Sequence, residues 1–363
     1  MNTEHLGHLL ATVDDHPPAG GPDIGALLAA GRARARRRRL GQAGLTVTAV
    51  AALAAATATA AVAWPGHHAG DRHRTPTAGS SRPAATVPAA PDRYDPTVRT
   101  VDFGALPAGL APHGSELTPA SQVAYAGVAD PRHGPVTEAE LEVHARGWNP
   151  DQPDQGEDVA CARGAPTDPV NGRPAFLAAQ PDRSGHSTNM RCVTGLVWEY
   201  APGSWAEVRT TGDSTTAQRQ AARDIATGAR FGLNLPQALP FQLAGIPAGT
   251  QVYGTRAATA GQRDGFKGGG GITLVDGAGK HLYLGCEAND TTSDNHAGRA
   301  DRQVNGHPAL FIPPDQLFVF KVNGGEVSVE ARRTQAELAA LAATVHPVDD
   351  PADPGHWTTH FLP

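Results

Sequence analysis

The chain has 363 residues, a formal net charge of −6 at pH 7 and only three cysteines. This mildly acidic balance argues against nucleic acid or anionic lipid as partners, because both attract basic surfaces. The length is enough for about two ordinary domains beside any membrane segment.

Residues 1–39 are predicted to form a cytoplasmic head. Apolar residues at helical spacing indicate two short helices here, separated by prolines and glycines within residues 17–22. Helices this short are marginal in isolation. Two interpretations stay open for the head: a partly disordered tail, or a docking helix for a cytosolic partner.

An arginine-rich run from Arg32 to Arg39 directly precedes an uncharged apolar stretch, Leu40 to Trp64. As a helix, this stretch would span roughly 37 Å, enough for the ~30 Å hydrocarbon core of a bilayer. Pro65 ends the helix at once, and arginines favour the cytoplasmic side of a membrane. The sequence therefore predicts a single-pass protein in the cell membrane, with its N-terminus inside and its C-terminal part outside.

Two alternatives to this membrane anchor stay open. Ala61-Val62-Ala63 matches the A-x-A pattern of a signal-peptide cleavage site, and Arg38-Arg39-Leu40 loosely resembles a twin-arginine signal. A cleaved signal would release the remainder of the chain. The other alternative is a buried alanine-rich helix of a soluble domain.

Residues 65–98 are rich in Pro, Ala, Thr and Ser and have almost no bulky apolar residues. Such a segment cannot build a core, so we expect a disordered linker.

From residue 99 onward the chain repeats short motifs in the same order. The motifs with their second copies are Leu106–Gly109 and Ile246–Gly249, Cys161 and Cys286, Val170–Ala175 and Val304–Ala309, Leu196–Val208 and Leu317–Val329, and Thr215-x-x-Gln218 and Thr334-x-x-Glu337. This common order predicts an internal duplication, with one repeat at 99–232 and the other at 233–363.

Each repeat has the pattern of several strands followed by one helix. Asp276–Gly279 and Asn323-Gly324 lie between short apolar runs, which is typical of β-hairpins. Thr215 and Thr334 each open a predicted capping box and helix, the second helix with Leu338, Leu341 and Val345 on one face. The predicted fold class is α+β: an N-terminal transmembrane helix, then two tandem antiparallel β-sheet modules, each closed by one C-terminal helix.

The three cysteines, Cys161, Cys192 and Cys286, all follow the predicted membrane segment. An oxidising exterior allows one disulfide among them. Cys161 and Cys192 are the local choice because both belong to the first repeat. The alternative is that all three are buried unpaired thiols.

The sequence contains no pattern that predicts a reaction centre. Gly277-Ala278-Gly279-Lys280 lacks the first glycine and the final Ser/Thr of a phosphate loop, and His356 and His360 lack the glutamate of a zinc-protease motif. We therefore predict no catalytic, cofactor-binding or metal-binding residues, and we expect the protein not to be an enzyme.

The order V-N-G-x-P-A, two hydrophobic strands and a Thr-capped helix resembles DUF4367-like domains. Residues 304–345 carry this resemblance best, and residues 170–225 carry it in the first repeat. Such domains have no known function and occur outside the membrane in bacterial single-pass proteins, often beside anti-sigma-factor-type segments. The head is similar to those of actinobacterial membrane proteins encoded near sigma factors, but it has no cysteine and so lacks the zinc motif of many anti-sigma domains.

Two functional hypotheses follow from these observations. The first is a tandem extracytoplasmic module that senses or binds a protein partner in the cell envelope, linked by the resemblance to sigma-factor or envelope signalling. The second is a binding or carrier module in which sheet and helix enclose a lipid-like ligand. The carrier hypothesis needs a large apolar cavity, whereas the interaction hypothesis needs a filled core.

Overall fold

A computed structural model of the chain describes residues 87–128, 136–152, 161–179, 192, 194–259, 267–288 and 297–363. The predicted head, the predicted membrane helix and residues 65–86 of the predicted linker lie outside this part. Among the described residues, no helix is both long and apolar enough to cross a membrane. Residues 83–363 form one compact unit.

The elements of this unit fall into two series. The first consists of β1 (Val98–Asp102), β2 (Ala111–Leu117), β3 (Ser121–Gly127), β4 (Glu138–His144), β5 (Ala162–Val170), β6 (Arg173–Ala179), β7 (Leu196–Ala201), β8 (Ser204–Thr211), α3 (Thr215–Gly228) and β9 (Arg230–Pro236). The second consists of β10 (Phe241–Leu243), β11 (Gln251–Thr259), β12 (Gly268–Val275), β13 (His281–Ala288), β14 (Arg302–Val304), β15 (His307–Ile312), β16 (Gln316–Val322), β17 (Gly325–Glu330), α5 (Gln335–Ala342), β18 (Val345–Pro347) and the short η3 (Pro354–His356).

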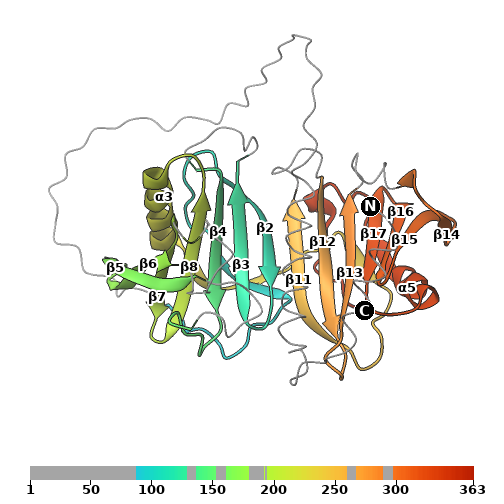
Figure 1. Cartoon of the computed structure of the whole chain (residues 1–363), viewed down its shortest axis with the longest axis horizontal. Coiled ribbons are helices and arrows are strands. Elements are labelled where there is room, and N and C mark those ends of the chain that lie inside the picture. Colours follow the sequence, from blue (N-terminus) through green and yellow to red (C-terminus); the bar gives the residue numbers. More distant parts are fainter. Residues whose placement is uncertain are drawn as a thin grey trace, which may run out of the picture. The chain divides into compact units, whose positions relative to one another are not determined.

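Fourteen of the described strands form one antiparallel sheet, in the order β14-β15-β16-β17-β13-β12-β11-β2-β3-β4-β8-β7-β6-β5 (Figure 1). Counted outward from the junction of β2 and β11, both halves have the same strand order, with α3 and α5 at matching places in the chain. The predicted antiparallel strands are present, and a helix follows the sheet strands of each half, α3 in the first and α5 in the second. The expectation of a separate sheet in each module is wrong, because β2 pairs with β11. This pairing satisfies backbone groups that two free sheet edges would expose.

Turn residues explain several hairpins. Asn171, Asn305 and Asn323 have positive φ angles of 50°, 51° and 48°, and a glycine with positive φ follows each one. Asn-Gly is the pair that tight hairpin turns favour, because both turn residues need positive φ. The predicted hairpin at Asn323 is confirmed.

The two helix starts differ from each other. Thr334 and Glu337 form the predicted capping box of α5. In α3 the N-cap is Ser214, whose side chain accepts the Ala217 N–H, so the capping box predicted at Thr215 is wrong by one residue. The second helix also ends earlier than predicted, since Val345 lies in β18.

One face of the sheet packs against a helix and a two-stranded ribbon in each half. β1 pairs with β9 and β10 pairs with β18, which brings the start and end of each half together. The first half buries α3 and the ribbon in one apolar cluster with the sheet, and the second half buries a corresponding cluster. The ribbons were not predicted, and the expected repeat boundary at residues 232 and 233 falls inside β9.

Two further expectations need correction. Within the predicted linker, Ala90 and Tyr94 are buried, so residues 87–98 belong to the folded unit. The small Ala90 lets its N–H reach the Ser204 hydroxyl at 2.8 Å, and Tyr94 supplies a bulky ring to the core. Cys161 precedes β5 whereas Cys286 lies on β13, the counterpart of β4, so these two cysteines are not equivalent positions.

Candidate functional site

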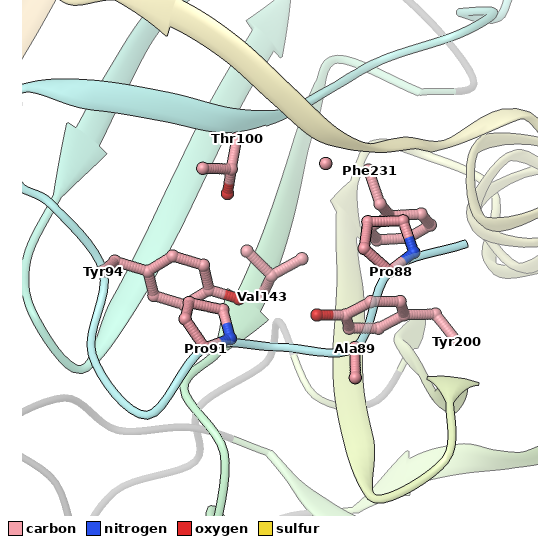
Figure 2. Close-up of a pocket in the computed structure, with 9 residues that line it drawn as sticks. Pro88, Ala89, Pro91, Tyr94, Thr100, Val143, Tyr200 and Phe231 are labelled. Carbon is pink, nitrogen blue, oxygen red and sulfur yellow. The ribbon is translucent and has the colours of Figure 1, made fainter. Parts of the chain in front are cut away.

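A small pocket lies where residues 88–100 cross the first half of the sheet (Figure 2). Its volume is about 100 Å³, and Tyr94, Tyr200 and Phe231 form much of its wall. The rings of Tyr200 and Phe231 stack at 4.1 Å with an interplanar angle of 3°. A pocket of this size holds a few water molecules, whereas drug-sized ligands occupy roughly 300–1,000 Å³.

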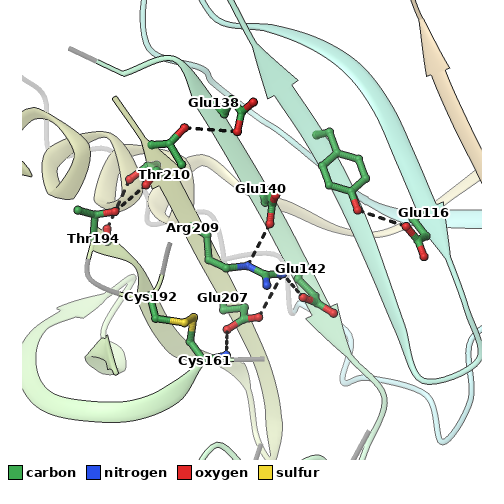
Figure 3. Close-up of polar contacts among 12 residues, drawn as sticks. Glu116, Glu138, Glu140, Glu142, Cys161, Cys192, Thr194, Glu207, Arg209 and Thr210 are labelled. Carbon is green, nitrogen blue, oxygen red and sulfur yellow. Dashed lines mark hydrogen bonds and ion pairs between the residues drawn. A yellow bond between two sulfur atoms is a disulfide. The ribbon is translucent and has the colours of Figure 1, made fainter. Parts of the chain in front are cut away.

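A cluster of charged side chains lies on the opposite face of the sheet, away from α3. Along β4, Glu140, Glu142 and His144 alternate with apolar residues that face the core. Glu207 and Arg209 of the neighbouring strand β8 lie directly across from Glu142 and Glu140 (Figure 3). Because side chains alternate between the two faces of a strand, all five point to the same face. We call these five residues the ionic cluster.

Arg209 holds the three carboxylates together. Its Nε lies 3.2 Å from Glu140 Oε2, and its Nη2 pairs with Glu142 and lies 3.4 Å from Glu207 Oε1. The side chains of Arg209, Glu142 and Glu207 are 10 %, 2 % and 0 % exposed. Burying charges carries a desolvation penalty that ion pairing often fails to recover. The sheet thus keeps these charged side chains buried despite their desolvation penalty.

His144 completes the cluster from the end of β4. Its ring stacks on Trp148 with centroids 3.8 Å apart and an interplanar angle of 8°. Its Nδ1 lies 4.0 Å from Glu142 Oε1, and its Nε2 lies 3.9 Å from Glu207 Oε1. Both distances are too long for hydrogen bonds. His144 Nε2 and Glu207 Oε1 are buried and have no hydrogen-bond partner among the described residues.

Burial sets the protonation of the cluster. Burial raises the pKa of Glu207 to about 8; Arg209 opposes this shift and Glu142 adds to it. Burial also acts to raise the pKa of Glu142, but Arg209 and His144 lower it below its ordinary value. Burial lowers the pKa of His144 to about 4, although the nearby charge of Glu142 acts to raise it. Burial thus favours the neutral forms of both Glu207 and His144.

A disulfide lies directly beside the ionic cluster. Cys161 and Cys192 are bonded, with Cα atoms 5.6 Å apart, and both are fully buried. The backbone N–H of Cys161 donates to Glu207 Oε2 at 2.9 Å. The disulfide thus fixes the start of β5 against the cluster. Cys286 is a free buried thiol whose pKa burial raises well above its ordinary value.

The second half of the sheet has different chemistry at the matching positions. In the repeat alignment, Ser328 corresponds to Glu207. Ser328 pairs with Gly285 across the strands, just as Glu207 pairs with Glu142, so Gly285 corresponds to Glu142. A Cβ atom on Gly285 would lie 2.7 Å from the hydroxyl of Tyr283, so the tyrosine lies across the glycine. The same strand order therefore forms without the buried acidic pair.

Cys161 and Cys192, the possible disulfide pair in the sequence, are bonded in the structure. The ionic cluster was not predicted. The signal was the alternation of charged and apolar residues along residues 138–144, which identifies one polar strand face. Alternation alone fits a solvent-exposed face equally well. The burial of this face depends on packing that the pattern does not contain.

Comparison with known proteins gives no family for the chain. No protein-family model matches it, so the resemblance to DUF4367-like domains stays a prediction, and no curated protein sequence matches it. Among solved structures, MucB in complex with MucA(peri) is similar over 66 % of this chain and 93 % of the other, with 12 % identity and a TM-score of 0.21. A MucA/MucB complex from Pseudomonas aeruginosa gives the same coverage and TM-score with 11 % identity. A TM-score this low assigns neither a fold nor a partner.

Proposed function

We propose that the chain is a membrane-anchored protein whose extracytoplasmic part is an interaction or sensing module in envelope signalling. Binding, and not catalysis, is the activity that we assign to it. The disulfide between Cys161 and Cys192 supports an oxidising location, since such bonds persist mainly outside the cytoplasm. The resemblance of the repeats to extracytoplasmic bacterial domains supports the link to envelope signalling.

The main support for this proposal is that buried side chains fill the space between the helix and the sheet in each half. Trp198 of β7 and Ile225 of α3 are at most 1 % exposed and pack in one cluster with β3, β4 and β8. In the second half, Leu338 of α5 and Phe361 near the C-terminus are similarly buried. A carrier would need an open cavity for acyl chains at these positions.

The lipid-carrier hypothesis is correspondingly weaker. The pocket beside Tyr94 and Tyr200 has about 100 Å³, too little for a lipid chain. Its wall includes Pro88 and Pro91 of the chain itself, so the segment that leads into the sheet occupies this region (Figure 2).

The test compares lipid binding with protein binding on the same full-length chain. Lipid extraction of the purified protein, followed by mass spectrometry, should yield no stoichiometric lipid. A photo-crosslinking residue at Leu235 or Ile312, which are exposed large apolar side chains, should give a discrete protein adduct in living cells. Arg219, exposed on α3, is the matched control position and should give no adduct. Stoichiometric lipid without an adduct would favour the carrier.

A separate experiment tests the topology. Protease added to spheroplasts should remove the C-terminal part and leave a small fragment anchored by residues 40–64. A soluble mature protein that begins near residue 64 would refute the anchor and favour signal cleavage.

A further inference from the structure

On the buried side of the ionic cluster, two polar atoms face each other without a hydrogen bond. His144 Nε2 and Glu207 Oε1 lie 3.9 Å apart, and neither has a hydrogen-bond partner in the described part of the chain, although Glu207 Oε1 forms an ion pair with Arg209 Nη2 at 3.4 Å. Leaving a buried polar atom such as His144 Nε2 without a hydrogen bond costs about 1–3 kcal/mol. The separation is too long for a hydrogen bond but fits two atoms that share a third partner.

Glu142 supplies another donor to the same space. Its Oε1 lies 4.0 Å from Nδ1, the other ring nitrogen of His144, while its Oε2 pairs with Arg209. One ligand atom from each of Glu142, His144 and Glu207 lies within 4.8 Å of the other two. Atoms bound tetrahedrally to one ion at ~2.1 Å lie about 3.4 Å apart, so binding would draw these three atoms closer together by up to about 1.4 Å.

We propose that Glu142, His144 and Glu207 bind one first-row divalent cation, with Zn²⁺ as the best match. One imidazole nitrogen and two carboxylate oxygens are ligands that zinc accepts, and a water molecule could complete four-coordination. Ca²⁺ fits poorly because it needs six to eight oxygen ligands. The site is independent of the partner proposed above and would join β4, β8 and the disulfide-bearing start of β5.

Two neighbours would orient the ligands. The Cys161 N–H donates to Glu207 Oε2, and Glu207 Oε1 faces both His144 Nε2 and Arg209 Nη2. The ring of Trp148 fixes the plane of the imidazole by stacking on it. Groups that hold ligands in this way commonly raise metal affinity.

The second repeat offers an internal comparison. Its counterparts of Glu142 and Glu207 are Gly285 and Ser328, and glycine has no ligand atom. We therefore expect one bound cation per chain and not two.

The experiment measures metal in the full-length protein, since the chain has 16 histidines that could bind metal weakly. Cells grown with added Zn²⁺ supply the protein, so that the buried site can fill during folding. After purification into lipid nanodiscs and a brief chelator wash, elemental analysis should find one zinc per chain. Glu207→Gln and His144→Gln should lower zinc affinity at least ~tenfold. His346→Gln, at an exposed position on β18, is the control and should retain the metal.

X-ray absorption at the zinc edge of the unaltered protein provides a second measurement that does not depend on how the variants fold. It should show nitrogen and oxygen ligands only, with one imidazole. Zinc absent from the unaltered protein, or retained by folded variants of both residues, would overturn the proposal. A spectrum with sulfur or several imidazoles would overturn it as well, because it would place the metal elsewhere.

Discussion

Removing the disulfide provides a direct test of what holds the first half of the sheet together. Cys161 and Cys192 are separated by 31 positions, and their bond restricts the unfolded chain over that length. For a loop of this length, the chain-entropy estimate gives about 3.7 kcal/mol of stabilisation at 25 °C. We expect Cys161→Ala/Cys192→Ala to lower the free energy of unfolding by that amount.

The assay is urea denaturation of residues 83–363, which form one compact unit, followed by tryptophan fluorescence. Trp148 and Trp205 pack beside the disulfide and should report its loss. Cys286→Ala is the matched control, because it removes a buried sulfur atom without opening a crosslink. Reduction of the unaltered protein should reproduce the loss, whereas the double variant should not respond to reductant.

Two results would refute this reasoning. Titration of three free thiols in the denatured, non-reduced protein would show that the bond does not form. A double variant as stable as Cys286→Ala would show that the bond forms without stabilising the sheet.

Three further predictions concern the cluster and the helix. In metal-free protein, Glu207 has a folded pKa of about 8 against an ordinary 4.5, so it holds a proton in the folded state that the unfolded state releases. Its contribution is complete below pH 4.5 and is lost as the pH rises toward 8. His144, with a pKa lowered from 6.5 to about 4, opposes this slope below pH 6.5. Between about pH 4.5 and 6.5 the two contributions should largely offset each other. Above pH 6.5 stability should fall by ~2 kcal/mol to pH 8, a fall that Glu207→Gln should abolish in urea titrations. Ile225→Ala should cost about 2–5 kcal/mol in the same assay, because the side chain is fully buried beneath α3; a cost below 1 kcal/mol would contradict that packing. Ser214→Ala should lower the free energy of unfolding by ~1 kcal/mol and Thr215→Ala by less than about 0.5 kcal/mol, because Ser214 caps α3. A larger effect for Thr215→Ala would favour Thr215 as the cap, as the sequence predicted.

Local patterns in the sequence were sufficient for the elements that depend on neighbouring residues. Asn323-Gly324 forms its predicted hairpin because few residue pairs tolerate two successive positive φ angles. Thr334 and Glu337 form their capping box because both partners lie within one helical turn. The order of short motifs in the two halves also pointed to the matching series of strands that the structure contains.

Long-range pairing was decided only by the tertiary structure. The pairing of β2 with β11, in which Glu116 lies opposite Arg256, joins the two halves into one sheet. No sequence motif at either position predicts a partner about 140 residues away. The ribbons of β1 with β9 and β10 with β18 arise in the same way, from strands too short or irregular to stand out.

The ionic cluster shows the same division most clearly. The sequence by itself determines that Glu140, Glu142 and His144 share one face of a strand, because a strand repeats every two residues. It does not determine that Glu207 and Arg209 lie across from them, or that the whole group is buried beside a disulfide. Burial and proximity arise from segments distant in sequence, and these two quantities set the pKa values and ligand geometry on which any function of the cluster depends.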